Sequence, residues 1–278
     1  MPALVSTEWL AERPSEPNVR IADASWYMPG AGRDAKAEYA SAHIPGAVFF
    51  DIDDLSDETS PLPHMLAPAP KFAERMRALG LGSGDQIVVY DGAGLFSSPR
   101  AWWMLRAMGH RNVFVLDGGL PKWRREGRPV ENVPAEQRQA DFAAHPDRAI
   151  IRNVSQMMEN LKSRVEQVVD ARGVARFTAV EPEPRAGLRG GHIPGSINVP
   201  YTQLTNADGT LKSPAALRAL FAQMRVDLSA PLVTSCGSGV TAALAMLALQ
   251  VAGAKTVALY DGSWAEWGAR ADAPVERD

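Results

Sequence analysis

The chain has 278 residues, of which 46% are hydrophobic and 22% charged, so it is long enough for one large domain or two ordinary ones. Its formal net charge of -3, without a block of like charges, offers no surface for a nucleic acid. One cysteine excludes an internal disulfide, and five scattered histidines show no metal-binding spacing, so we expect neither a metal nor a cofactor.

The sequence contains no segment that predicts export or membrane insertion. Residues 1–8 lack a charged region followed by an apolar core, so a cytoplasmic location is expected. Residues 228–254 carry no charge, but Pro231 and two glycines interrupt them. We therefore interpret them as a buried strand and a buried helix, because an uninterrupted helix there would be too short for ~30 Å of hydrocarbon.

One sequence unit occurs twice in the same order. In each copy an apolar run precedes a His-Ile-Pro-Gly motif, a second apolar run, a third that ends in Asp-Gly, and a closing tryptophan. The first copy has these at 19–25, 43–46, 86–91, 113–119 and Trp123, and the second at 167–172, 192–195, 231–236, 257–263 and Trp267. We infer duplication of a whole domain.

Within each copy, short Val/Ile-rich runs alternate with helical patterns. The patterns predict helices at 70–79, 99–108 and 214–224. This alternation predicts an α/β fold with two tandem domains, each a mostly parallel sheet flanked by helices. The polar, proline-containing segment 128–148 is interpreted as the linker, which gives predicted domains at 1–140 and 150–278.

The only cysteine, Cys236, lies between a predicted buried strand at 230–235 and a predicted buried helix at 240–251. The Gly-Ser-Gly turn after it lets backbone N–H groups point inward, and the helix dipole adds positive potential. Thiol pKa values of ~8.5 fall to roughly 3.5–7.5 in such settings, so Cys236 is a predicted nucleophile. The alternative is a cysteine buried as a small hydrophobe. The equivalent turn in the first copy, 91–94, begins with Asp91 and has no nucleophile.

These features resemble the two-domain rhodanese superfamily, and most closely its members that use 3-mercaptopyruvate. The resemblance covers nearly the whole chain, and its most specific part is the loop Cys-Gly-Ser-Gly-Val-Thr at 236–241. The other matching motifs are both His-Ile-Pro-Gly segments, 23–27, 51–53, 60–61, 64–66, 117–119, 181–185 and 261–264.

The resemblance implies a sulfurtransferase. Cys236 would attack the sulfur of 3-mercaptopyruvate, giving a persulfide and pyruvate, and the loop residues Gly237, Gly239, Val240 and Thr241 would bind the donor. Since no second cysteine can resolve the persulfide, an external thiol such as thioredoxin or a low-molecular-weight thiol, or cyanide, must accept the sulfur. No nucleic-acid or membrane partner is expected.

Two arginines match the superfamily's substrate-binding positions, Arg176 and Arg185. A planar guanidinium fits the carboxylate and keto oxygen of an α-keto acid better than an ammonium does. Arginines in a polar loop are often only solvated, which is the alternative. Arg172 and Arg189 are close in sequence and could substitute for either.

The resemblance also implies a proton relay of Ser238, His64 and Asp53 that serves the departing enolate. The alternative is that all three are turn or loop residues. His43 and His192 are expected to make structural hydrogen bonds instead. Because Asp53 and His64 come from the first copy, the active site is expected between the two domains.

Three rival functions can be compared with the loop. A cysteine phosphatase needs an arginine six residues after its cysteine, and Ala242 stands there. A thiosulfate sulfurtransferase would resemble this chain elsewhere but carry basic residues in the loop, whose interior is neutral here. A non-catalytic rhodanese module for binding or sulfur relay is disfavoured because Cys236 and both arginines are present.

Overall fold

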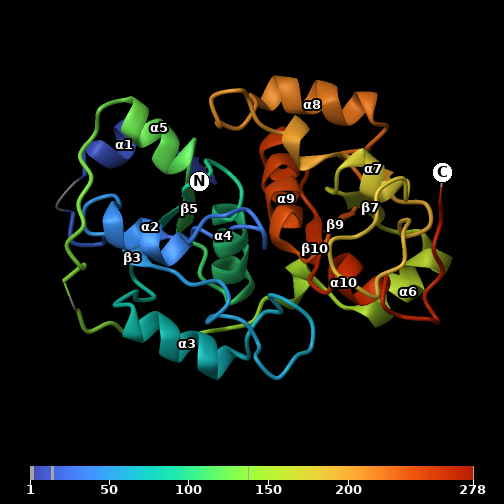
Figure 1. Ribbon diagram of the computed structural model, residues 1–278, viewed down its shortest axis with the longest axis horizontal. Helices are drawn as coiled ribbons and strands as arrows, with labels where there is room; N and C mark the ends of the chain where they lie inside the picture. The colour runs from blue at the N-terminus through green and yellow to red at the C-terminus, as the bar shows by residue number, and fades with distance from the viewer. Residues whose placement is uncertain (1–2, 14–15, 137, 278) are drawn as a thin grey trace. The chain divides into compact units, whose positions relative to one another are not determined.

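The computed structural model describes residues 3–13, 16–136 and 138–277, which separate into two compact units (Figure 1). Unit 1 comprises Met1–Glu58, Leu66–Asp147 and Asn206–Leu211, and unit 2 comprises Thr59–Met65, Arg148–Thr205 and Lys212–Asp278. Unit 1 thus includes Asn206–Leu211 from the C-terminal half of the chain, and unit 2 includes Thr59–Met65 from the N-terminal half. The domain ranges 1–140 and 150–278 do not contain this exchange and stay a prediction.

In unit 1 the described residues form a five-stranded parallel sheet in the order β1-β5-β4-β2-β3. The strands are β1 Leu4–Val5, β2 Val19–Asp23, β3 Val48–Phe49, β4 Gln86–Tyr90 and β5 Val113–Leu116. The helices are α1 Thr7–Ala11, α2 Ala35–Ser41, α3 Ala69–Ala78, α4 Ser98–Ala107 and α5 Gly119–Arg125.

Unit 2 repeats this arrangement, with a five-stranded parallel sheet in the order β6-β10-β9-β7-β8. The strands are β6 Ile151–Arg152, β7 Gln167–Asp170, β8 Ile197–Asn198, β9 Leu232–Ser235 and β10 Val257–Tyr260. The helices are α6 Val154–Ser163, α7 Val174–Phe177, α8 Pro214–Gln223, α9 Val240–Ala252 and α10 Ser263–Trp267, with 3₁₀ turns η1 Arg148–Ile150 and η2 Tyr201–Gln203.

The predicted α/β class, with one mostly parallel sheet per repeat, is confirmed. Helices α3, α4 and α8 lie within one residue of their predicted ranges, and the apolar run at 228–254 forms β9 and α9. Nearly every residue of α9 is buried, which explains why the run lacks charges. Within the described part of the chain, no helix has the length and apolar character needed to span a membrane.

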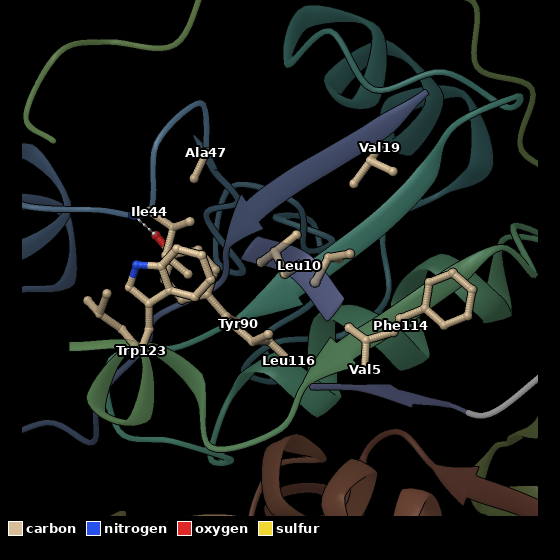
Figure 2. Packing of buried hydrophobic residues seen from close by; sticks show 11 residues of the cluster. Val5, Leu10, Val19, Ile44, Ala47, Tyr90, Phe114, Leu116 and Trp123 are labelled. Carbon is tan, nitrogen blue, oxygen red and sulfur yellow. Dashed lines mark hydrogen bonds between the residues drawn. The ribbon is translucent and has the colours of Figure 1, made fainter. Parts of the chain in front are cut away.

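The His-Ile-Pro-Gly motifs attach a loop to the core of each unit. In unit 1 the backbone N–H of Ile44 donates to the Tyr90 hydroxyl at 3.1 Å, beside Trp123 and Leu116 (Figure 2). The ring of His43 bonds the carbonyl oxygens of Tyr39 and Val133 at 2.7 and 3.1 Å. Burial of these polar groups is therefore compensated.

The histidine of the second motif has an equivalent structural role. His192 bonds the carbonyl oxygen of Phe177 at 3.0 Å and stacks on its ring, with the ring centroids 3.7 Å apart. The prediction that His43 and His192 make structural hydrogen bonds is confirmed.

The predicted linker packs along unit 1. From 128 to 147 its described residues form only an isolated bridge, between Glu131 and His43. Phe142 is nevertheless buried, and Arg138 forms an ion pair with the buried Asp85 at 2.6 Å. Phe142 and Arg138 are isolated in the sequence and do not form a helical or strand pattern. The packing of the linker on unit 1 was therefore not predictable from the sequence pattern.

Candidate active site

Cys236 lies directly after β9, the central strand of the unit 2 sheet, and α9 begins four residues later at Val240. The predicted strand-to-helix turn is thus confirmed. The carboxyl ends of central strands are where open parallel sheets bind ligands. Cys236 itself is 2% exposed, so a reagent must enter the loop to reach its sulfur.

The first turn of α10 fixes the start of this loop. The backbone N–H of Cys236 donates to Ser263 Oγ at 3.2 Å, and its carbonyl oxygen accepts from the N–H of Trp264 at 2.9 Å. The Gly237 carbonyl oxygen accepts from the N–H of Ala265 at 2.9 Å. The last two of these bonds engage the carbonyl oxygens of Cys236 and Gly237 with the first turn of α10.

The remaining backbone of the loop can bind an anion. Within the described residues, no acceptor bonds the backbone N–H groups of Ser238, Gly239 or Val240. Gly239 takes φ = 81°, a left-handed conformation that turns the chain into α9. The 13 residues of α9 add a helix dipole whose positive end lies at the loop. A negatively charged group bound in the loop would be stabilised there.

Arg176 brings a fixed positive charge to the same loop. It lies on the short helix α7, and a Cβ atom added to Gly237 would come within 2.9 Å of Arg176 Nη2. The guanidinium therefore packs on the backbone directly after Cys236. Any side chain at position 237 would displace it.

Glu183 holds two arginines at once. Its side chain is only 2% exposed, and its carboxylate pairs with Arg176 and, at 2.8 Å, with Arg172 Nη1. Arg172 also forms a two-point ion pair with Asp170 and lies over the Trp264 ring at 4.3 Å. Burial lowers the pKa of Arg172, but the two carboxylates outweigh it and raise that pKa overall. The Arg172 guanidinium thus stays charged and is held in place by Asp170 and Glu183.

Arg172 and Arg189, the suggested substitutes for the predicted substrate-binding arginines, both have other partners in the structure. Arg172 is occupied by the two carboxylates described above. Arg189 donates to the carbonyl oxygens of Trp267 and Gly268, both at 3.0 Å, and thereby fixes the turn after α10. Arg185 is half-buried, and its binding role stays a prediction.

Of the three predicted relay residues, Ser238 and His64 belong to unit 2 and Asp53 belongs to unit 1. Ser238 is 5% exposed within the loop, and His64 is buried in the segment Thr59–Met65, which also belongs to unit 2. His64 has φ = 60°, which is unusual for a residue other than glycine and is found preferentially at functional sites. Asp53 belongs to unit 1, is exposed, and accepts a hydrogen bond from Trp26 Nε1 at 3.0 Å. The relay itself stays a prediction.

Sequence reasoning did not assign a role to Glu183 or Ser263. Both lie inside motifs that carried the resemblance, at 181–185 and 261–264. A glutamate between two prolines, close in sequence to Arg172 and Arg176, was the available signal for an ion-pair network. The Ser263 hydroxyl has no comparable signal, because its bond to Cys236 joins the ends of two different strands.

Comparison with known proteins places these features in a family. The rhodanese-like domain matches the chain twice, over residues 6–126 and 153–270. Human 3-mercaptopyruvate sulfurtransferase is 48% identical over 275 residues, which cover 97% of this chain and 93% of that protein. A thiosulfate sulfurtransferase of Cricetulus griseus is 47% identical over 272 residues, with 95% and 91% covered.

Solved structures agree with this assignment. The crystal structure of SseA from Escherichia coli, described as a 3-mercaptopyruvate sulfurtransferase with a rhodanese fold, superposes with a TM-score of 0.87 at 43% identity. The match covers 95% of this chain and 99% of SseA. The resemblance drawn from the sequence is confirmed: the chain belongs to the rhodanese-like domain family and carries that domain twice.

Proposed function

We propose that this protein transfers sulfur from 3-mercaptopyruvate, through a persulfide on Cys236, to an external acceptor and releases pyruvate. The observation that carries this proposal is the Cys236 loop, in which backbone N–H groups without an acceptor among the described residues follow the cysteine at the end of a central strand, and Arg176 packs on Gly237. The loop has no charged side chain between Cys236 and Val240. A monoanionic α-keto acid suits such a neutral loop better than a dianion does.

The reaction begins when the Cys236 thiolate attacks the sulfur of the donor. A sulfur–sulfur bond forms while the carbon–sulfur bond of mercaptopyruvate breaks, and its electron pair leaves as the enolate of pyruvate. The enolate then takes a proton on carbon. The outer sulfur carries negative charge, which the backbone N–H groups of Gly237, Gly239, Val240 and Thr241 stabilise through the loop and the α9 dipole.

Arg176 and Arg185 bind the donor's carboxylate and keto oxygen. The guanidinium of Arg176 is already held at the loop by Glu183, so little side-chain entropy is lost when the donor binds. A fixed cation also orients the donor so that its sulfur meets Cys236.

Ser238, His64 and Asp53 supply the proton that the enolate needs. Ser238 lies two residues from the nucleophile, and the unusual backbone of His64 supports a functional position. His64→Ala should slow pyruvate release at least about tenfold, while alkylation of Cys236 by iodoacetamide changes little. Equal slowing of both reactions would instead indicate a role in shaping the loop.

The acceptor is an external thiol such as thioredoxin or a low-molecular-weight thiol, and cyanide can replace it. The single cysteine carries this part of the proposal, since no second thiol in the chain can take the sulfur. The expected cytoplasmic location is part of the same proposal, and cell fractionation tests it.

Thiosulfate is the alternative donor, because a relative with 47% identity bears the name thiosulfate sulfurtransferase. The discriminating assay compares pyruvate release from 3-mercaptopyruvate with thiocyanate formation from thiosulfate and cyanide. We expect the first reaction to have the higher kcat/KM. Replacing Gly237 and Ser238 with Arg and Lys should shift the preference toward thiosulfate, and an unchanged ratio would mean that other groups select the donor.

A further inference from the structure

The amino ends of two central strands in unit 1 border a cavity of about 490 Å³. Gln86 begins β4 and Val113 begins β5, so this cavity lies at the end of the sheet opposite the loop that begins at Asp91. Its polar lining consists of Gln86, Arg106, Arg111 and Asn112, and its apolar lining of Ala3, Val113 and Phe114. The volume falls within the ~300–1,000 Å³ typical of small-molecule sites.

The two arginines give this cavity an excess of positive charge. The Arg106 guanidinium lies over the Trp102 ring at 5.1 Å, and its Nε is buried without a hydrogen-bond acceptor among the described residues. Arg111 is 80% exposed and lies 3.5 Å from one carboxylate, that of Asp147. Burial, and then the neighbouring Arg111, lower the pKa of Arg106 against the opposing effect of Asp147. Two cations therefore share one anion.

The second unit provides an internal comparison for this place in the fold. Strand register pairs Ile87 with Val113 and Leu232 with Val257, so Pro231 and Thr256 are the counterparts of Gln86 and Asn112. These counterparts line a cavity of about 480 Å³.

The positive charge of that second cavity is offset by two carboxylates of its own lining, Glu159 and Glu166. Its arginine, Arg152, makes a two-point ion pair with Glu166, at 2.9 Å through Nε and 2.7 Å through Nη2. The unit 1 cavity has no such buried glutamate in its lining. The same position of the duplicated fold is thus closed to an external anion in unit 2 and available to one in unit 1.

We infer that the unit 1 cavity binds a small phosphate-type oxyanion, either inorganic phosphate or the phosphate group of a small organic ester. Arg106 and Arg111 would supply charged hydrogen bonds, for which guanidinium and phosphate are well matched. The amide of Gln86 would complete the polar side, and Phe114 would contact an ester's apolar body. This site is separate from the proposed sulfur transfer and does not depend on it.

The test titrates inorganic phosphate and phenyl phosphate into the full chain at constant ionic strength. Backbone amide shifts of Asn112 and Phe114 locate the site by NMR, which separates it from any anion bound at the Cys236 loop. We expect saturable shifts there, and binding weakened by about tenfold or more in Arg106→Gln and Arg111→Gln. Tighter binding of phenyl phosphate would assign an ester as the ligand, and equal binding would assign inorganic phosphate.

The matched control is Arg218→Gln, which removes one exposed arginine from α8 in unit 2. Arg218→Gln should bind both probes as the parent does, and Arg111→Gln should release pyruvate at the parental rate. Absence of saturable shifts at Asn112 and Phe114, or equal weakening in Arg218→Gln, would overturn the inference. Because Arg111 is mostly exposed, its variant remains informative even if Arg106→Gln fails to fold.

Discussion

The loops that follow the central strands β4 and β9 have the same position in the duplicated fold, but only the first contains a carboxylate that accepts hydrogen bonds from its own backbone N–H groups. After β4, the buried carboxylate of Asp91 accepts from the backbone N–H groups of Phe96, Ser97 and Ser98 at 2.9, 3.0 and 2.8 Å. After β9, Cys236 leaves its loop N–H groups without a protein acceptor among the described residues. One loop contains its own anion, and the other is available to an external one. This teaches that the anion-binding geometry comes from the fold, whereas the residue after the strand decides what it binds.

A guanidinium–carboxylate pair packs on the first glycine of each loop. Arg33 donates to the Gly92 carbonyl oxygen at 3.2 Å and pairs with Glu38 at 2.6 Å, as Arg176 packs on Gly237 and pairs with Glu183. The pairs differ in burial, because the Glu38 side chain is 40% exposed and that of Glu183 only 2%. Unit 2 thus holds its arginine with the more deeply buried carboxylate.

Removing the thiol should abolish the difference in chemistry between the loops. We expect Cys236→Ser to lower pyruvate release by at least about a thousandfold, because serine keeps the shape but not the nucleophile. The circular dichroism spectrum and the unfolding midpoint should stay close to those of the parent. Substantial turnover by a folded Cys236→Ser protein would contradict covalent catalysis.

Removing the carboxylate from the other loop should affect stability. Asp91→Ala leaves three backbone N–H groups without this acceptor, two of them buried, so we expect unit 1 to lose about 3 kcal/mol or more of unfolding free energy. Urea unfolding followed by tryptophan fluorescence measures this loss. The matched change Cys236→Ala should cost no more than about 1 kcal/mol. Similar costs at both positions would mean that the Asp91 bonds are not what holds the first loop.

Much of this comparison was accessible from the sequence. The turn at Cys236 was predicted within a residue or two because a charge-free run at 228–254, broken by Pro231 and glycines, leaves few alternatives. The duplicated motifs predicted a mostly parallel sheet in each copy, but the order of the strands within each sheet came only from the structure. The role of Asp91 was not predicted, because its acceptor bonds reach five to seven residues along an irregular loop that has no periodic pattern.

Other features depend on burial, which sequence spacing does not reveal. Arg172 was an apparent substitute for Arg176, yet its side chain is 1% exposed and bonded to Asp170. The exchange of Thr59–Met65 and Asn206–Leu211 between the units involves short segments without a helical or strand period. Their packing follows from tertiary contacts, such as the N–H of Leu211 donating to Asp117 Oδ1 at 2.8 Å.

Loosening Arg176 should make its loop behave more like the first one. Glu183→Gln weakens the pairing of Arg176 and leaves Arg172 with one carboxylate, so we expect KM for mercaptopyruvate to rise about tenfold, with a smaller change in kcat. Glu181→Gln, at an exposed position of the same segment, is the matched control and should leave KM unchanged. A fall in kcat with unchanged KM would show that Glu183 acts on the chemical step instead.

The smallest effect is expected from adding one methyl group to the loop. Gly237→Ala would place a Cβ atom 2.9 Å from Arg176 Nη2, and the flexible side chain would have to shift. We expect KM to rise by about threefold, which corresponds to about 0.6 kcal/mol. Gly84→Ala, which meets nothing within 4 Å, is the control. A parental KM in Gly237→Ala would mean that the position of Arg176 is not critical for donor binding.

The central claim is that Cys236, in a loop that leaves its anion site open, carries the transferred sulfur. Intact-protein mass spectrometry after addition of 3-mercaptopyruvate without an acceptor tests it directly, with pyruvate measured in the same sample. The account predicts one added sulfur atom per chain, located at Cys236, and one pyruvate released for each sulfur bound. Release of pyruvate at many equivalents per chain, with no sulfur found on Cys236, would contradict it.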